Sequence, residues 1–76
     1  MRVLITGMEG FAGSHLAQLA LARGAEVHGT VRPGAGRENL RGCRGVRAHA
    51  ADVTDSGALR RLLRRLKPGR VFHLAG

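Results

Sequence analysis

The chain has 76 residues, which allows one domain with a small hydrophobic core. Its single cysteine, Cys43, excludes a disulfide framework and is typical of a reducing, cytoplasmic compartment. The net charge of +8 is compatible with nucleic-acid binding, but the clustered arginines have no aromatic residues between them, a pattern more typical of a solvated surface. We therefore expect no nucleic-acid partner, and because no apolar run is long enough for a signal peptide or a membrane span, we expect no membrane partner either.

The chain begins with a strand pattern followed by a helix pattern. Residues 2–6 form a short apolar run rich in β-branched side chains, which is typical of a parallel strand buried on both faces. Residues 11–23 have the periodicity of a helix, and Gly24 stands where a C′ glycine would end it. The stripe predicted to face the core consists of Ala12, Leu16, Leu19 and Ala20.

The remaining chain predicts three more strands and one more helix. Residues 26–31 predict a second strand, and the Gly- and Arg-rich residues 34–45 predict a loop without a good covering helix. Residues 46–50 predict a third, weaker strand. Leucines at helical spacing behind an Asp or Ser cap predict a helix over residues 56–66, and residues 70–75 predict a fourth strand.

This succession of elements predicts an α/β fold. Right-handed crossovers place four parallel strands in the order 3-2-1-4, with a helix on each face of the sheet. The arrangement is a partial Rossmann fold, and residues 1–76 are expected to form the N-terminal half of a dinucleotide-binding domain without a substrate domain.

A glycine-rich turn with the spacing G-x-x-G-x-x-G lies between the first strand and the first helix. Gly7 allows the tight turn, Gly10 leaves room for backbone N–H groups to approach a pyrophosphate, and Gly13 allows close packing of the helix on the sheet. The helix N-terminus adds its positive dipole. The turn therefore predicts a site for the pyrophosphate of a nicotinamide cofactor.

Two further residues follow strands and suit other parts of a dinucleotide. Arg32 ends the second strand, where no Asp or Glu stands, and a guanidinium there favours the 2′-phosphate of NADP over NAD; a solvent-facing arginine is the alternative. Asp52 is placed to accept from the adenine amine with Val53 against the ring, and a turn or capping aspartate is nearly as well supported. We expect His73 to be a packing residue, and we predict no metal site.

In their order and spacing, these motifs resemble those of the extended short-chain dehydrogenases/reductases, which are NAD(P)-dependent sugar-nucleotide epimerases, dehydratases and reductases. The matching segments are Thr6-Gly7-x-x-Gly10-Phe11-x-Gly13, Ala51-Asp52-Val53-Thr54-Asp55 and Val71-Phe72-His73-Leu74-Ala75-Gly76. Residues 26–32 look most like the GDP-mannose 4,6-dehydratase branch, although Pro33 replaces the second arginine that often follows there. The cofactor-binding residues that the resemblance implies are Gly7, Met8, Gly10, Phe11, Gly13, Arg32, Asp52, Val53, Leu74, Ala75 and Gly76.

The family's catalytic Ser/Thr and Tyr-x-x-x-Lys pair have no counterpart here, because the chain has no tyrosine and its only lysine is Lys67. We assign no catalytic residue, expect no turnover by this chain alone, and regard it as a fragment or a natural truncation. A non-catalytic nucleotide-binding or regulatory stub that assembles with another chain is the alternative, and a small basic nucleic-acid binder is less favoured. The fourth strand carries no Lys or Pro over Val71–Leu74, which predicts self-association or a partner chain at this edge.

Overall fold

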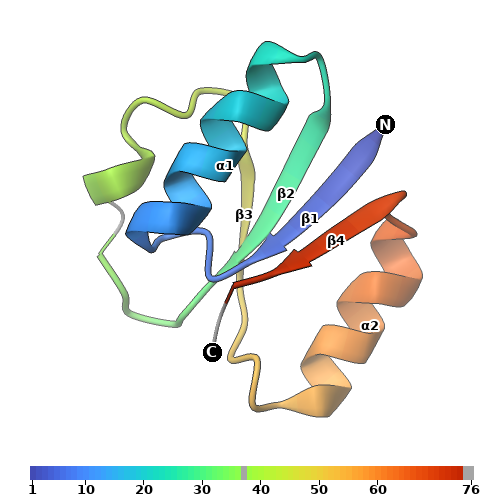
Figure 1. Cartoon of the computed structure of the whole chain (residues 1–76). Helices are drawn as coiled ribbons and strands as arrows, with labels where there is room; N and C mark the ends of the chain where they lie inside the picture. Colours follow the sequence, from blue (N-terminus) through green and yellow to red (C-terminus); the bar gives the residue numbers. More distant parts are fainter. Residues whose placement is uncertain (37, 75–76) are drawn as a thin grey trace.

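The computed structural model describes residues 1–36 and 38–74. Four parallel strands form one sheet in the order β3-β2-β1-β4 (Figure 1). The strands are β1 (Arg2–Thr6), β2 (Glu26–Val31), β3 (Arg47–Ala50) and β4 (Arg70–His73). The helices α1 (Phe11–Ala22) and α2 (Ser56–Leu66) make the β1–β2 and β3–β4 crossovers. The predicted α/β fold and its strand order are confirmed.

Both faces of β1 are buried, because side chains alternate along a strand. Val3 and Ile5 join the apolar cluster under α1, whereas Leu4 packs on the other face against Leu62 and Leu66 of α2. The two helices therefore cover opposite faces of the sheet, as predicted. Asp55 caps α2, since its Oδ1 accepts from the Ala58 backbone N–H at 3.1 Å.

The buried face of α1 differs from the predicted stripe. The residues that it buries are Gly13, Ser14 and Ala17. Leu16 and Ala20 pack at the margin of the core, but Ala12 is exposed and Leu19 is 52% exposed, so the prediction was wrong for these two. At Gly13 the helix lies so close to the preceding turn that no side chain fits there.

The loop between β2 and β3 forms one short 3₁₀ turn, η1 (Glu38–Leu40), and no longer helix among the described residues. It nevertheless contributes to the core beside α1. Leu40 packs against the core, and Cys43 is buried with its thiol donating to the Ser14 carbonyl at 3.6 Å. The Gly- and Arg-rich composition correctly predicted the lack of a covering helix but gave no indication that Cys43 is buried.

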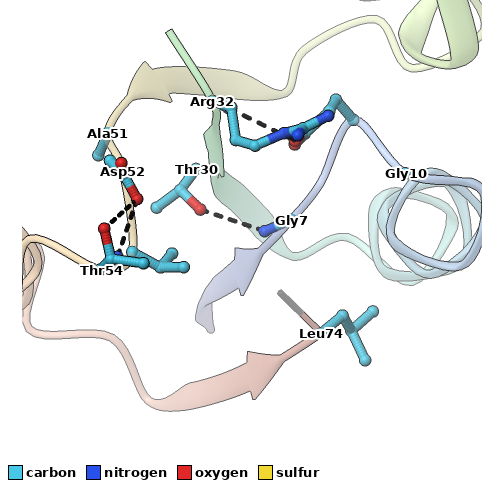
Figure 2. Close-up of a pocket in the computed structure, with 10 residues that line it drawn as sticks. Gly7, Gly10, Thr30, Arg32, Ala51, Asp52, Thr54 and Leu74 are labelled. Atoms are coloured by element: carbon cyan, nitrogen blue, oxygen red, sulfur yellow. Dashed lines mark hydrogen bonds and ion pairs between the residues drawn. The ribbon is translucent and has the colours of Figure 1, made fainter. Parts of the chain in front are cut away.

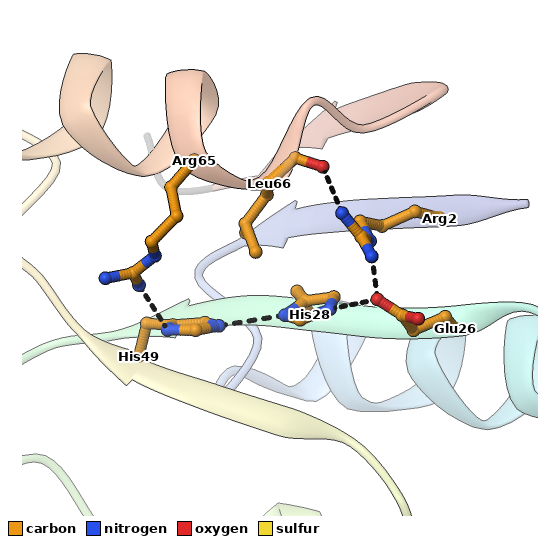
Figure 3. A network of polar contacts seen from close by, with 6 residues as sticks. All are labelled: Arg2, Glu26, His28, His49, Arg65 and Leu66. Atoms are coloured by element: carbon orange, nitrogen blue, oxygen red, sulfur yellow. Dashed lines mark hydrogen bonds and ion pairs between the residues drawn. The ribbon is translucent and has the colours of Figure 1, made fainter.

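A row of polar contacts joins the last turn of α2 to the face of the sheet that this helix covers (Figure 3). Its members are Arg65, His49, His28, Glu26, Arg2 and the carbonyl of Leu66. Because an arginine only donates, Arg65 must donate to Nδ1 of His49 at 3.3 Å. Neutral His49 then donates from Nε2 to Nδ1 of His28 at 2.9 Å, and His28 donates from Nε2 to Glu26 at 2.6 Å.

One arrangement of protons therefore satisfies the whole row. His28 is buried, so its ring depends on these partners. The bonds from His28 and then Arg2 lower the pKa of Glu26 to about 2. Burial, followed by the nearby positive groups, lowers the pKa of His49.

Candidate dinucleotide-binding site

A cleft of about 350 Å³ lies at the carboxyl ends of the four strands (Figure 2). The residues that line it lie at the end of a strand or just after one: Gly7, Glu9, Gly10, Thr30, Arg32, Ala51, Asp52, Val53, Thr54 and Leu74. The order of the strands reverses between β1 and β4, and the helices α1 and α2 leave toward opposite faces. Open parallel sheets bind ligands in the crevice at such a switch point.

The glycine-rich turn is held in place by the end of β2. Gly7 has a φ of 71°, which glycine adopts without strain. Its N–H donates to Oγ1 of Thr30 at 3.1 Å, and the N–H of Met8 donates to the Thr30 carbonyl at 2.9 Å. Thr30 thus fixes both residues at the start of the turn, and Figure 2 shows its contact with Gly7. Nothing in the local sequence pattern distinguishes Thr30 from other strand residues, so this role was not predicted.

Gly13 and Gly10 differ in the space around them. A Cβ on Gly13 would lie 2.3 Å from the carbonyl oxygen of Gly7 and 2.8 Å from Cα of Met8, which are backbone atoms. A Cβ on Gly10 would lie 3.4 Å from the same Gly7 oxygen, an ordinary contact. Close packing of the helix is therefore the role of Gly13, as predicted, whereas the fold itself leaves room for a methyl group at Gly10.

The N-terminus of α1 opens at this turn without a protein cap. Gly10 is the N-cap residue with extended backbone (φ −74°, ψ 169°), no side chain caps the helix, and its first turn carries no acidic residue. The first N–H groups of a helix have no partner within it, so they attract anions. The glycine-rich turn and this helix end fit a pyrophosphate, and their backbone N–H groups would hold it.

Arg32 extends from the end of β2 toward the glycine-rich turn (Figure 2). Its side chain is 78% exposed, and its Nε lies 3.3 Å from Oε1 of Glu9. The same carboxylate oxygen accepts from the Arg32 backbone N–H at 3.4 Å. Arg32 therefore lies in the cleft, as predicted, but beside an acidic residue that the sequence analysis did not select.

Asp52 forms a turn immediately after β3. Its Oδ1 accepts from the backbone N–H and the hydroxyl of Thr54 at 2.9 and 2.7 Å (Figure 2). The bond from the hydroxyl, and then that from the backbone, lowers the pKa of Asp52. The structure thus gives Asp52 the turn role that was one of its two interpretations, and it also places the residue in the cleft next to Val53.

The sequence matches one protein family over nearly its whole length. The model of the family described as GDP-mannose 4,6 dehydratase matches residues 4–76. The chain belongs to this family. The motifs that indicated extended short-chain dehydrogenases/reductases therefore predicted the family correctly.

Individual relatives agree with the family match. The chain is 41% identical over 76 residues to the GDP-mannose 4,6-dehydratase sdnI of Sordaria araneosa, covering 93% of this chain and 14% of that protein. It is 36% identical over 83 residues to the GDP-mannose 4,6-dehydratase of Vibrio cholerae, covering 96% of this chain and 22% of that protein. The chain thus spans less than a quarter of the length of these dehydratases.

Solved structures of other enzymes have the same fold. UDP-glucose 4-epimerase of Thermus thermophilus in complex with NAD is similar with a TM-score of 0.84 and 40% identity, covering 100% of this chain and 24% of that one. The Bordetella bronchiseptica enzyme WbmG in complex with NAD and UDP is similar with a TM-score of 0.85 and 38% identity, covering 100% of this chain and 25% of that one.

In this member of the dehydratase family, the cleft brings together six of the predicted site residues: Gly7, Gly10, Arg32, Asp52, Val53 and Leu74. The other described ones lie elsewhere. The Met8 side chain is fully buried in the core, Gly13 lies beneath the turn, and Phe11 is 74% exposed with its ring centroid 4.5 Å from that of His15. Ala75 and Gly76 lie outside the described residues.

The rest of the described chain adds few other chemical groups near the site. His73 Nδ1 lies 2.8 Å from Oγ1 of Thr6, which also accepts from the Leu74 N–H at 3.0 Å, so His73 takes part in fixing the end of β4. Over residues 1–36 and 38–74, no group of three or more His, Cys, Asp or Glu side chains is placed to hold a metal ion. No helix in this part of the chain is long and apolar enough to cross a membrane.

Proposed function

We propose that this chain is the NADP(H)- or NAD(H)-binding segment of a sugar-nucleotide dehydratase, epimerase or reductase. The observation that carries the proposal is the cleft, in which a glycine-rich turn, an uncapped helix N-terminus, Arg32 and Asp52 meet at a topological switch point. Relatives of the same fold, among them WbmG and the Thermus thermophilus epimerase, are known in complex with NAD. When bound, the cofactor supplies hydride chemistry, and the residues of this chain hold and orient it.

We further propose a preference for NADP(H) over NAD(H). Arg32 follows β2 at the position where an acidic residue would bind the ribose hydroxyls of NAD. Its exposed guanidinium is suited to a charge-assisted bond with a 2′-phosphate. Such a bond is worth about 1.5–3 kcal/mol at full strength, and exposure to water favours the low end, about a tenfold difference in affinity. In this proposal Asp52 accepts from the adenine amine and Val53 contacts the ring.

The 76 residues contain no group to which we assign catalysis, and sugar-nucleotide turnover is proposed only for a longer protein of which this chain would be part. A non-catalytic nucleotide-binding or regulatory stub would use the same cleft. The single thiol, Cys43, is buried and has no second cysteine to pair with, which supports a cytoplasmic protein.

The proposal extends to assembly through β4. Within the described residues β4 pairs with β1 and with no other strand. Val71 is 48% exposed and Leu74 is 44% exposed, and an edge strand that carries apolar side chains is a template for association. For this chain alone, the proposed partner is a second copy that covers β4.

Titration calorimetry with NADP⁺ and NAD⁺ tests the cofactor proposal. We expect tighter binding of NADP⁺, and Arg32→Asp should reverse the preference by removing a cation and adding an anion. Arg60→Asp, on the exposed side of α2, makes the same charge change away from the cleft and should leave the preference unaltered. Equal affinities before and after Arg32→Asp would show that Arg32 is only a surface charge. A basic nucleic-acid binder would instead show no cofactor affinity and a steep salt dependence with oligonucleotides.

A further inference from the structure

The acidic group at the end of β2 comes from the glycine-rich turn instead of from β2 itself. Glu9 Oε1 contacts Arg32 at two points, its Nε at 3.3 Å and its backbone N–H at 3.4 Å. The Glu9 side chain is only 11% exposed, whereas that of Arg32 is 78% exposed. Glu9 also lines the cleft together with Gly7 and Gly10. A carboxylate is therefore held at the ribose end of the cleft, although Thr30, Val31 and Arg32 at the end of the strand supply none.

The two cofactors would meet this carboxylate differently. The 2′-hydroxyl of NAD is a hydrogen-bond donor, and a carboxylate at this position of a dinucleotide-binding fold accepts from it. The 2′-phosphate of NADP carries about −1.5 to −2 charges and only accepts at neutral pH. To reach Arg32 it must displace or approach the Glu9 carboxylate, and like charges at this distance repel.

Arg32 acts in the opposite sense. Its guanidinium attracts the 2′-phosphate, but part of its charge already faces Glu9 at 3.3 Å. Because the Glu9 side chain is mostly buried and Arg32 is not, Arg32 is the member of the pair that can turn toward a ligand while Glu9 stays in place. The contact between them places two groups with opposite preferences at one subsite.

We propose that Glu9 and Arg32 form an opposed pair that sets the choice between NAD and NADP, with Glu9 accepting from the ribose 2′-hydroxyl of NAD and opposing the 2′-phosphate of NADP. The proposal rests on the proposed dinucleotide-binding function. In it, the preference for NADP is the balance between the attraction of the 2′-phosphate by Arg32 and its repulsion by Glu9. Glu9 thereby takes the place of the acidic residue that β2 lacks.

The test compares the ratio of NAD⁺ to NADP⁺ dissociation constants in the full chain and in the variants Glu9→Gln, Arg32→Gln and their combination. Glu9→Gln is nearly isosteric and should raise the preference for NADP⁺ about tenfold, because it removes one charge facing the phosphate across an open cleft. Arg32→Gln should lower the preference by a similar factor, and the double variant should return it close to the starting value. Glu38→Gln in η1 makes the same charge change away from the cleft and should leave the ratio unchanged.

The ratio is a robust readout even where a variant is less stable, because a reduced folded fraction weakens both apparent affinities equally. If the ratio of NAD⁺ to NADP⁺ dissociation constants changes no more in Glu9→Gln than in Glu38→Gln, the proposed role of Glu9 is overturned. The proposed dinucleotide site is not affected by that result. A shift toward NAD⁺ in Glu9→Gln also overturns the proposed role of Glu9. If the unmodified chain binds neither cofactor, the proposed function fails, and the role of Glu9 fails with it.

Discussion

Two glycines of the same turn are expected to respond in opposite ways to the same substitution. Gly13→Ala puts a methyl group 2.3 Å from the Gly7 carbonyl oxygen and 2.8 Å from Cα of Met8. Neither atom belongs to a side chain that can rotate away, so α1 and the turn must move apart. Gly10→Ala puts a methyl group at an ordinary contact distance of 3.4 Å, and the φ of −74° at Gly10 is accessible to alanine.

The magnitudes follow from opposing effects at each position. Alanine inside a helix is about 1 kcal/mol more favourable than glycine, whereas forced overpacking costs about 1–3 kcal/mol or more. With backbone atoms on both sides of the clash, Gly13→Ala should lose about 2 kcal/mol net, a large part of the roughly 3–5 kcal/mol that so small a core supplies. At Gly10 the loss of a preferred N-cap residue and the lower entropy of the unfolded chain nearly cancel, leaving a change within about 0.5 kcal/mol.

Urea unfolding followed by circular dichroism, combined with cofactor titration, separates the two roles. Gly13→Ala should lower the urea midpoint by about 2 M, for a denaturant slope of about 1 kcal/mol per M. Gly10→Ala should keep its midpoint yet bind NADP⁺ at least about tenfold more weakly, because its methyl group would stand between the helix N–H groups and the pyrophosphate. An unchanged midpoint in Gly13→Ala, or an equal loss of stability in both variants, would refute this division of roles.

Two other predictions concern pH and assembly. The lowered pKa of His49 makes its neutral form part of the folded state, so stability should start to fall as the pH drops below its ordinary value of 6.5. The pKa of Glu26 is lowered from 4.5 to about 2, so its carboxylate stabilises the fold at pH values above 4.5. This stabilisation should be lost as the pH falls from 4.5 toward 2. Urea midpoints measured across this range check both, and Glu26→Gln should make the lower step smaller, leaving the part that comes from Asp52; a stability that is flat from pH 6.5 to 2 would contradict the network in Figure 3. Sedimentation of the unmodified chain at micromolar concentration should show a dimer or larger assembly, and Val71→Lys on the β4 edge should shift it toward monomer; a stable folded monomer without that substitution would count against assembly through β4.

Local patterns and chain topology were enough to predict the elements and their arrangement. Alternating strand and helix patterns placed β1, β2 and α2 at their observed bounds and α1 to within a residue. Because successive strands were separated by connections long enough for right-handed crossovers, the parallel order β3-β2-β1-β4 followed without further information. The strand order in turn places the glycine-rich turn, Arg32 and Asp52 at one edge, since the carboxyl ends of parallel strands meet there.

Contacts between residues distant in sequence were decided only by the tertiary structure. Met8 belongs to the glycine-rich turn by sequence, yet its side chain is buried against Gly29, where a Cβ would lie 2.3 Å from its sulfur. Thr30 holds Gly7 across 23 positions, and the same separation divides Glu9 from Arg32. The hydrophobic pattern of a segment predicts its own secondary structure, but it carries no information on which side chain of another segment fills the space beside it. In the folded chain, the hydrogen bonds from Gly7 and Met8 to Thr30 hold the turn against β2, with the Met8 side chain in the core and Glu9 lining the cleft.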